Sequence, residues 1–549
     1  MSILLELDLT GAIVEDIGSH PVERLVNRKR TALRTLVSRL ASAGDDPSVV
    51  GLLAKLGTTS MSLAQAQELS EAVARFRAKG KEAIAWAETF GELGRGTTAY
   101  VVATGFGELW LQPSGSIGLM GAAAAGAFVR AALDRAQVEP LFSQRYEYKN
   151  APDTFLRTEF SEAHREATGR LAESAYEQVV AAVSTGRRLA PDRVRELIDQ
   201  APISAAQALE AGLIDHIGYR DAVREAVDRH WPEKPALLYV SRYQRRWDNV
   251  HKALQQRRPA IGLIEAVGSI RLGRSKPGPV GRAAGSDTVT AAFRAAVKDE
   301  RIKAIVFRVN SPGGSYVASD TIWREVCRAR EASKPVVVSM GDVAGSGGYF
   351  VAMAADVIVA EPGTLTGSIG VFGGKLRTSG LFERLGVNVE TLGLGQHALM
   401  FSSQTGFSED EWAKLDEWLD FVYEDFTSKV ARGRSMTREA VHELARGRVW
   451  TGADAAERGL VDELGGLHRA AEIARERAGL ALDARLRPVL AISPVQRLRP
   501  PRNSDDPAAF LQAGGLGQEL SEWGGHAQLA AALGLPAAGP LTMPMGPLR

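Results

Sequence analysis

Residues 302–340, IKAIVFRVNSPGGSYVASDTIWREVCRAREASKPVVVSM, decide the fold class of this chain. Two apolar runs, IKAIVFRVN and PVVVSM, are rich in β-branched residues and predict strands. Between them, residues 319–332 have the pattern of a helix. A strand, one helix and a second strand form a parallel βαβ unit with a right-handed crossover. The stretch therefore predicts an α/β domain built on a parallel sheet.

The same order of segments occurs twice in the 549 residues. Three matched pairs carry this similarity: LTGAI (9–13) with AVGSI (266–270), SGSIGLMG (114–121) with TGSIGVFG (366–373), and AQALEAGLIDHIG (206–218) with ADAAERGLVDELG (453–465). Self-similarity of this kind indicates an internal duplication. A chain of this length also exceeds the roughly 250–300 residues at which single cores stop growing. Two tandem α/β domains are expected.

We expect the first domain to cover residues 1–250 and the second to cover residues 251–495. The join lies near residues 231–258, where a charge-rich segment interrupts the pattern. Residues 496–549 form a Pro/Gly-rich tail that we expect to be poorly ordered.

Composition excludes several classes of function. The 66 basic and 65 acidic residues nearly cancel, so nothing favours nucleic acid as a partner. One cysteine, Cys327, excludes an internal disulfide, and no histidine pair has the spacing of a helical zinc site. No metal or other cofactor is implied. The amino terminus meets acidic residues at once, which predicts a strand and neither a signal peptide nor a transmembrane segment.

A candidate nucleophile lies in VVVSMGDVAGSGGYFVAMAAD (336–356), which predicts a strand, a glycine-rich turn and a helix that begins near Ser346. A serine there is exposed at a sharp turn, and the helix amides favour negative charge beside it. Gly-Ser-Gly alone is typical of loops. A histidine-based triad lacks a histidine in a recognisable motif, so another base is required.

Two further segments could complete such a site. In VNSPGGSYVAS (309–319), Gly313 and Gly314 follow a predicted strand and could present a backbone N–H to an oxyanion. In TLTGSIGVFGG (364–374), Ser368 stands 22 residues after Ser346. Each segment taken alone is equally consistent with an ordinary turn between a strand and a helix.

Together, NSPGG, VAGSGGY and LTGSIG resemble the signal peptide peptidase A (protease IV) family over about residues 1–480. In the long, duplicated form of that family, the nucleophilic serine lies in the second repeat and the catalytic lysine in the first. The resemblance implies Ser346 as the nucleophile. It also implies Lys149 as the general base, because YEYKNAPDTF (146–155) is similar to the segment of the family lysine.

The duplication is consistent with this division of roles. At the 247-residue offset between the repeats, Lys149 aligns with Gln396. In the alignment on the paired tyrosines of the two repeats, Ser346 aligns with Thr97. Each repeat therefore keeps one of the two groups.

The resemblance implies a ClpP/crotonase-like fold for each repeat and a Ser-Lys peptidase mechanism. Ser368 would orient the lysine amine, and backbone N–H groups of Gly347 and of the Gly313–Gly314 turn would stabilise the oxyanion. A lysine can act as a base near neutral pH only if its pKa falls, which burial can achieve by up to roughly 3–5 units.

The resemblance further implies partners and a location. Substrates would be hydrophobic or extended peptides, especially signal-peptide remnants, and the assembly would be a bowl-shaped homotetramer. Many long family members carry an amino-terminal membrane anchor, whereas this chain starts directly at its first predicted strand. We therefore expect a cytoplasmic protein or one with peripheral membrane contact.

Two other functions stay open at this level. One is an acyl-CoA hydratase, isomerase or thioesterase, which would share the fold and its paired oxyanion donors but would not need a serine and a lysine divided between repeats. The other is a catalytically silent scaffold that binds hydrophobic peptides.

Overall fold

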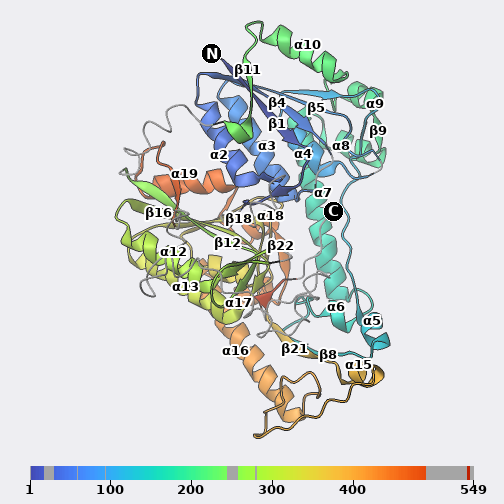
Figure 1. The fold of residues 1–549 in the computed structure, drawn as a ribbon, viewed down its shortest axis with the longest axis vertical. Helices are drawn as coiled ribbons and strands as arrows, with labels where there is room; N and C mark the ends of the chain where they lie inside the picture. Colours follow the sequence, from blue (N-terminus) through green and yellow to red (C-terminus); the bar gives the residue numbers. More distant parts are fainter. Residues whose placement is uncertain are drawn as a thin grey trace.

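The computed structural model describes residues 2–17, 30–57, 60–92, 94–243, 258–278, 281–489 and 541–543. These residues form two α/β units, each built around a twisted sheet that is largely parallel, as Figure 1 shows. The predicted fold class, two tandem α/β domains, is confirmed. The predicted boundary at residue 250 falls outside the described residues, so the domain limits stay a prediction.

The first sheet uses only strands that precede residue 244, and all its pairings are parallel. Its order is β10 (His216–Ile217), β6 (Glu108–Leu111), β5 (Glu82–Ala87), β4 (Val49–Leu56), β1 (Ile3–Leu9) and β11 (Ala236–Tyr239). The amino terminus is thus a strand, as its pattern predicts. Apolar side chains on both faces explain why the central strands are buried.

The second sheet repeats this plan. Its order is β22 (Val449–Thr451), β20 (Leu365–Gly367), β18 (Val336–Gly345), β16 (Ile302–Ser311), β12 (Ala260–Val267) and β24 (Leu486–Pro488), with β19 (Val357–Ala360) and β23 (Glu463–Leu464) branching from β18. The pairings are parallel except for β20 with β22. The two runs that predicted strands in the opening stretch became β16 and β18.

Helices cover both faces of each sheet. The larger core of the first repeat lies under α2 (Leu33–Gly44), α3 (Leu63–Ala78), α4 (Thr97–Ala103), α7 (Glu162–Arg187), α8 (Pro191–Asp199) and α9 (Ala205–Glu210), and the smaller one lies under α10 (Arg220–His230). The second repeat uses α12 (Ser286–Lys298), α13 (Tyr316–Glu331), α14 (Gly347–Ala352), α16 (Glu409–Arg434), α17 (Arg438–Leu444) and α18 (Gly452–Glu457) on one face and α19 (Leu467–Arg477) on the other.

Matched interactions show that the repeats share one architecture. The hydroxyl of Tyr100 donates to the Leu213 carbonyl oxygen, and that of Tyr349 donates to the Leu460 carbonyl oxygen. The long helices α7 and α16 are both 26 residues long and both end at a residue in the left-handed conformation. These pairs confirm the duplication that the sequence predicts.

The two repeats are joined by a buried ionic contact. The Arg308 guanidinium of β16 bonds to Glu15 and Glu68 of the first repeat, with N–O distances of 2.7 Å to each. A further bond runs from the Ser62 hydroxyl to the Asp342 carboxylate. Through these contacts α3 lies against the α19 side of the second sheet, where Glu68 also accepts from the Leu467 amide. The buried charges are paired, as burial requires.

A second connection extends from the first repeat along the other one. In Figure 1, α7 runs down beside the second repeat towards α5 (Arg130–Arg135) and α6 (Asp153–Leu156). There β8 (Glu139–Gln144) pairs antiparallel with β21 (Phe372–Arg377), next to α15 (Ser379–Arg384). This ribbon positions the segment that follows β8 against the second repeat.

A small sheet lies beside the carboxyl end of β16. Its order is β14 (Lys276–Gly278), β15 (Gly281–Gly285), β13 (Ser269–Arg271), β17 (Gly313–Gly314) and β25 (Leu541–Thr542). Of the predicted tail, residues 496–540 and 544–549 lie outside the described residues. For Leu541–Met543 the expectation of poor order was wrong, because the free edge of β17 supplies these residues with backbone hydrogen-bond partners. Two short ladders, β2 (Ile13–Val14) with β3 (Thr31–Ala32) and β7 (Ser116–Ile117) with β9 (Ile203–Ser204), and the 3₁₀ turn η1 (Val240–Arg242) complete the described elements.

Candidate active site

Ser346 stands at a sharp turn between a strand and a helix. Strand β18 ends at Gly345, and Ser346 is the N-cap residue of α14 with φ of 54° and ψ of −114°. A non-glycine residue in such a conformation costs on the order of 1–3 kcal/mol and persists only where the surroundings enforce it. Here the Ser346 amide donates to the Gly367 carbonyl oxygen at 2.8 Å. The turn therefore holds the hydroxyl at the amino-terminal end of α14.

Lys149 reaches this serine from the other repeat. The residues that follow β8 are fastened to the second repeat by the Arg145 amide, which donates to the Val371 carbonyl oxygen, and the Tyr148 amide, which donates to the Arg446 carbonyl oxygen. The Lys149 Nζ then lies 2.8 Å from the Ser346 Oγ, although 197 residues separate the two in sequence. This distance is within hydrogen-bond reach, as proton transfer requires.

The Lys149 side chain is completely buried. Burial lowers the pKa of its ammonium group well below the ordinary lysine value, because desolvation disfavours the charged form. Within the described residues no carboxylate offsets that effect. A neutral amine at this position can accept the proton of the neighbouring hydroxyl.

Ser368 completes the surroundings of the amine. It follows β20, has a φ of 51°, and donates its own amide to the Arg448 carbonyl oxygen at 2.7 Å. The Lys149 Nζ lies 3.0 Å from the Ser368 Oγ and 3.1 Å from its carbonyl oxygen. Three oxygen atoms of two serines therefore fix the direction of the lysine amine.

The three predicted oxyanion glycines lie together beside this group. A Cβ added at Gly347 would stand 3.1 Å from both the Gly313 Cα and the Gly314 N. Gly347 is the first residue of α14, where backbone amides have no partner within the helix. The Gly313 amide already donates to the Ser311 Oγ at 3.1 Å. The sequence-predicted residues are thus brought together, and Ser311 joins them as a residue that the motifs did not single out.

Gly447 is a second residue that sequence reasoning missed. Its φ is 88°, and a Cβ there would stand 2.3 Å from the Lys149 N and 2.5 Å from the Lys149 Cβ. Only glycine fits this close approach to the backbone that carries the amine. The RGRVW segment that contains it (446–450) carries no signal that would have marked it.

Replacing Gly447 with alanine should therefore lower both stability and peptide hydrolysis. The added methyl group would displace Lys149, and a displacement of about 1 Å can cost roughly 100-fold in rate. Thermal unfolding and kcat/KM measure the two effects. Gly80→Ala is the matched control, since Gly80 has a φ of 77° but nothing within 4 Å of the added Cβ. Equal kinetic losses in both variants would contradict this role for Gly447.

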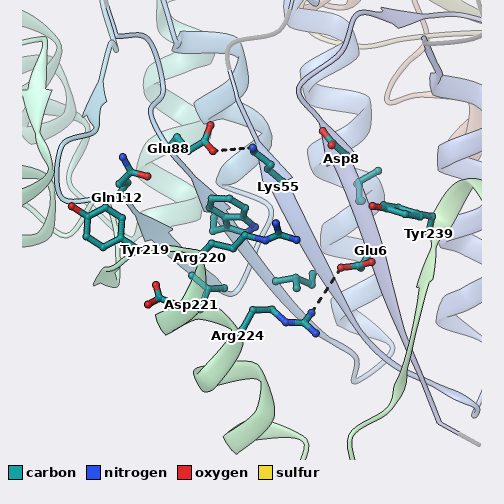
Figure 2. Close-up of a pocket in the computed structure, with 14 residues that line it drawn as sticks. Glu6, Asp8, Lys55, Glu88, Gln112, Tyr219, Arg220, Asp221, Arg224 and Tyr239 are labelled. Atoms are coloured by element: carbon teal, nitrogen blue, oxygen red, sulfur yellow. Dashed lines mark hydrogen bonds and ion pairs between the residues drawn. The ribbon is translucent and has the colours of Figure 1, made fainter.

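A separate pocket lies in the first repeat, at the carboxyl ends of β1, β4 and β5 and beside α10 (Figure 2). Charged side chains of both signs line it, including the pairs Lys55–Glu88 at 2.9 Å and Arg224–Glu6 at 3.8 Å. The Lys55 Nζ also lies 5.1 Å from the centre of the Trp86 ring. None of the predicted site residues lines this pocket.

Comparison with known proteins assigns the family. The sequence profile of peptidase family S49 matches residues 75–231 and 328–481, one region in each repeat. The chain belongs to this family. Family S49 membership and the relatives below make it a serine peptidase, as the motifs predict.

Two relatives of the S49 chain match most of its length. It is 31% identical to "Serine protease SPPA, chloroplastic" of Arabidopsis thaliana over 88% of this chain and 70% of that protein. It is 32% identical to "Protease 4" of Salmonella typhi over 86% of this chain and 78% of that protein. These matches confirm the resemblance to the signal peptide peptidase A (protease IV) family.

Among solved structures, a ClpP1 variant from Listeria monocytogenes aligns with 40% of the S49 chain at 13% identity and a TM-score of 0.25. In the described part of the chain, no helix combines the length and the apolar character needed to cross a bilayer. The same residues contain no cluster of three or more His, Cys, Asp or Glu side chains placed to hold a metal ion.

Proposed function

We propose that this serine peptidase hydrolyses peptide bonds with Ser346 as nucleophile and Lys149 as general base. The observation that carries the proposal is the 2.8 Å distance between the Ser346 Oγ and a fully buried lysine amine. Burial explains how the Lys149 amine can be neutral at neutral pH. A lysine with no catalytic role ordinarily lies in water and keeps its charge.

The geometry supports the following proposed steps. The Lys149 amine takes the proton of the Ser346 hydroxyl while the Oγ attacks the peptide carbonyl carbon. The Gly347 amide, with the Gly313–Gly314 turn, stabilises the negative charge that develops on the carbonyl oxygen. The lysine ammonium then gives its proton to the leaving amine. Water, deprotonated by the Lys149 amine, then hydrolyses the acyl-enzyme. Ser368 keeps the Lys149 amine directed at the reacting atoms.

Activity should rise with pH through the lowered pKa of Lys149. Below that pKa the amine is protonated and cannot accept the Ser346 proton, and above it the base is available. The midpoint of the acidic limb of kcat/KM should therefore lie well below the ordinary lysine value. A pH profile with a peptide substrate measures it. A limb that rises only near the pKa of an exposed lysine would contradict the proposal.

Hydrophobic or extended peptides, including signal-peptide remnants, fit the site as substrates. The edge of β17 next to Ser346 accepts an antiparallel strand, because β25 pairs with it there. An extended peptide could dock in the same way, with main-chain hydrogen bonds for affinity and pockets for alternate side chains. Cleavage of synthetic signal peptides, compared with charged peptides of equal length, tests this preference.

The two alternative functions, an acyl-CoA enzyme and a silent scaffold, predict a different result from the peptidase mechanism with an active-site probe. A fluorophosphonate forms a covalent bond with an activated serine hydroxyl. Labelling of Ser346, located by mass spectrometry, would support the peptidase mechanism. Absence of labelling would favour an acyl-CoA enzyme that uses only the oxyanion donors, or a silent scaffold.

The internal contact between repeats supports the proposed homo-oligomer. Lys55 takes the position in the first sheet that Arg308 takes in the second. Lys55 pairs with Asp8, and Arg308 pairs with Glu265. Asp8 and Glu265 align with each other through the match of LTGAI with AVGSI. The pocket of Figure 2 therefore lies on the face of the first repeat that corresponds to the docking face of the second.

The complementary surface of the second repeat is exposed. Leu272 corresponds to Glu15 by the same match, and Val317 corresponds to Ala64 because each is two residues past a serine N-cap. Glu15 and Ala64 are 6% and 2% exposed, whereas Leu272 and Val317 are 62% and 53% exposed. Exposed apolar side chains at positions that are buried in the matching contact indicate a protein partner. Head-to-tail docking of copies could close into the tetramer.

The double variant Leu272→Glu, Val317→Glu should therefore reduce the assembled mass in sedimentation equilibrium. Two charges would have to be buried without partners at each contact, which costs several kcal/mol. Leu482→Glu is the control, since Leu482 is exposed but is not one of the two matched positions. An unchanged mass in the double variant would exclude this mode of assembly.

A further inference from the structure

The segment Leu541–Met543, called the tail segment below, lies in the peptide-binding edge of the candidate site. Gly314 pairs with Leu541 and Gly313 with Thr542 in antiparallel register. The Met543 amide donates to the Pro312 carbonyl oxygen at 2.8 Å. The side chains of Leu541 and Met543 are fully buried or nearly so, in a stretch that is otherwise rich in proline and glycine.

The tail segment touches the turn that presents the nucleophile. A Cβ added at Gly345, directly before Ser346, would stand 2.4 Å from the Met543 Sδ. A Cβ added at Gly313 would stand 1.9 Å from the Leu541 carbonyl oxygen and 2.6 Å from the Gly347 N. The tail backbone therefore passes beside the glycines that we assign to the oxyanion site.

We propose that the tail segment is a built-in occupant of the substrate edge, which restrains the peptidase until a substrate displaces it. This proposal rests on the proposed function. Strand β17 has two edges, and β13 takes one of them through the pairing of Ile270 with Gly314. The tail segment takes the other edge. A peptide that docks as a strand beside Ser346 needs the same edge, so the two compete.

The competition has a predictable size. The tail segment belongs to the same chain as β17, so its pairing is intramolecular and does not depend on protein concentration. An occupant that fills the edge about 90% of the time lowers the free fraction about tenfold, and the apparent affinity for a competing peptide falls by the same factor. KM should carry this effect, while kcat should not, because a bound substrate meets unchanged catalytic groups.

Met543→Asp tests the proposal by placing a charge in the apolar position beside Gly345. We expect Ser346 to react with a fluorophosphonate about tenfold faster than in the wild type, and KM for a hydrophobic peptide to fall by a similar factor. A synthetic peptide of residues 538–545 should inhibit the variant competitively. Leu482→Asp, which places the same charge on an exposed leucine, should leave both values unchanged.

A chain that ends at Gly539 gives the same readouts without a new charge, and thermal unfolding checks that each variant is folded. Equal labelling rates in the wild type and in a folded variant, with no inhibition by the peptide, would overturn the tail segment as an occupant and leave the Ser-Lys mechanism intact. Absence of labelling in every protein would instead overturn the proposed function, and this inference with it.

Discussion

Replacing Lys149 with methionine is expected to lower kcat/KM for peptide hydrolysis by about 100- to 10,000-fold, the usual contribution of a general base. Methionine fills a similar volume and is an apolar residue suited to a buried site, but it cannot accept the Ser346 proton. Among the described residues, the hydrogen bonds of the amine go to Ser346 and Ser368 alone, so the loss should appear mainly in kcat. Steady-state kinetics with a peptide substrate measure it.

The control for this variant is another lysine with a structural bond. Lys334 is partly buried, which lowers its pKa, and it donates to the Ala296 and Asp299 carbonyl oxygens, so it is a lysine with a structural role and no contact with Ser346. Lys334→Met should lower the free energy of unfolding and leave kcat near that of the wild type. If Lys149→Met kept full activity, the base would have to be another group.

Ser346→Ala should have the largest effect of all. Loss of a nucleophilic serine removes the covalent route, and residual hydrolysis would come only from substrate binding and the oxyanion donors. We expect a fall in kcat on the order of 10⁵- to 10⁶-fold and complete loss of fluorophosphonate labelling. Alanine has to adopt the same positive φ as Ser346, at a similar backbone strain, so we expect the turn to keep its conformation in the variant.

The matched control is a buried serine away from the amine. Ser174 is buried and bonds to the Thr451 hydroxyl at 2.8 Å. Ser174→Ala should change stability but neither labelling nor kcat. Labelling that persists in Ser346→Ala would place the nucleophile elsewhere, and the roles assigned to Lys149 and Ser368 would then fail together.

The fold was accessible from sequence because its signals are local. Alternation of apolar runs with helical patterns predicts β16, α13 and β18 within a few residues, and the repeat of whole segments predicts a second copy of the same plan. The glycines around Ser346 also predict a turn and a helix start locally, whereas the positive φ of Ser346 is held by the carbonyl oxygen of Gly367. The matches to family S49 confirm the predicted class of enzyme.

The meeting of the two repeats was not visible in any local pattern. Lys149 was singled out through the resemblance and the alignment of the repeats, and its distance from Ser346 follows from the β8–β21 ribbon. Gly447 was missed because the need for glycine at this position comes from the close approach of the Lys149 backbone, about 300 residues earlier in the chain. For the tail segment the local reading was wrong, since three residues flanked by prolines have no periodicity and gain a strand conformation only from the edge of β17.

The sequence by itself determined the α/β class, the duplication, the family and the position of a turn at Ser346, because each can be read from local patterns and from their order along the chain. Tertiary structure alone decided that the Lys149 amine is desolvated, that it contacts a serine of the other repeat, and that the tail segment lies at the substrate edge. The physical reason is that desolvation and edge pairing are properties of the surroundings. The sequence around a lysine or a short apolar run predicts neither desolvation nor edge pairing, because distant parts of the chain supply the surroundings that cause them.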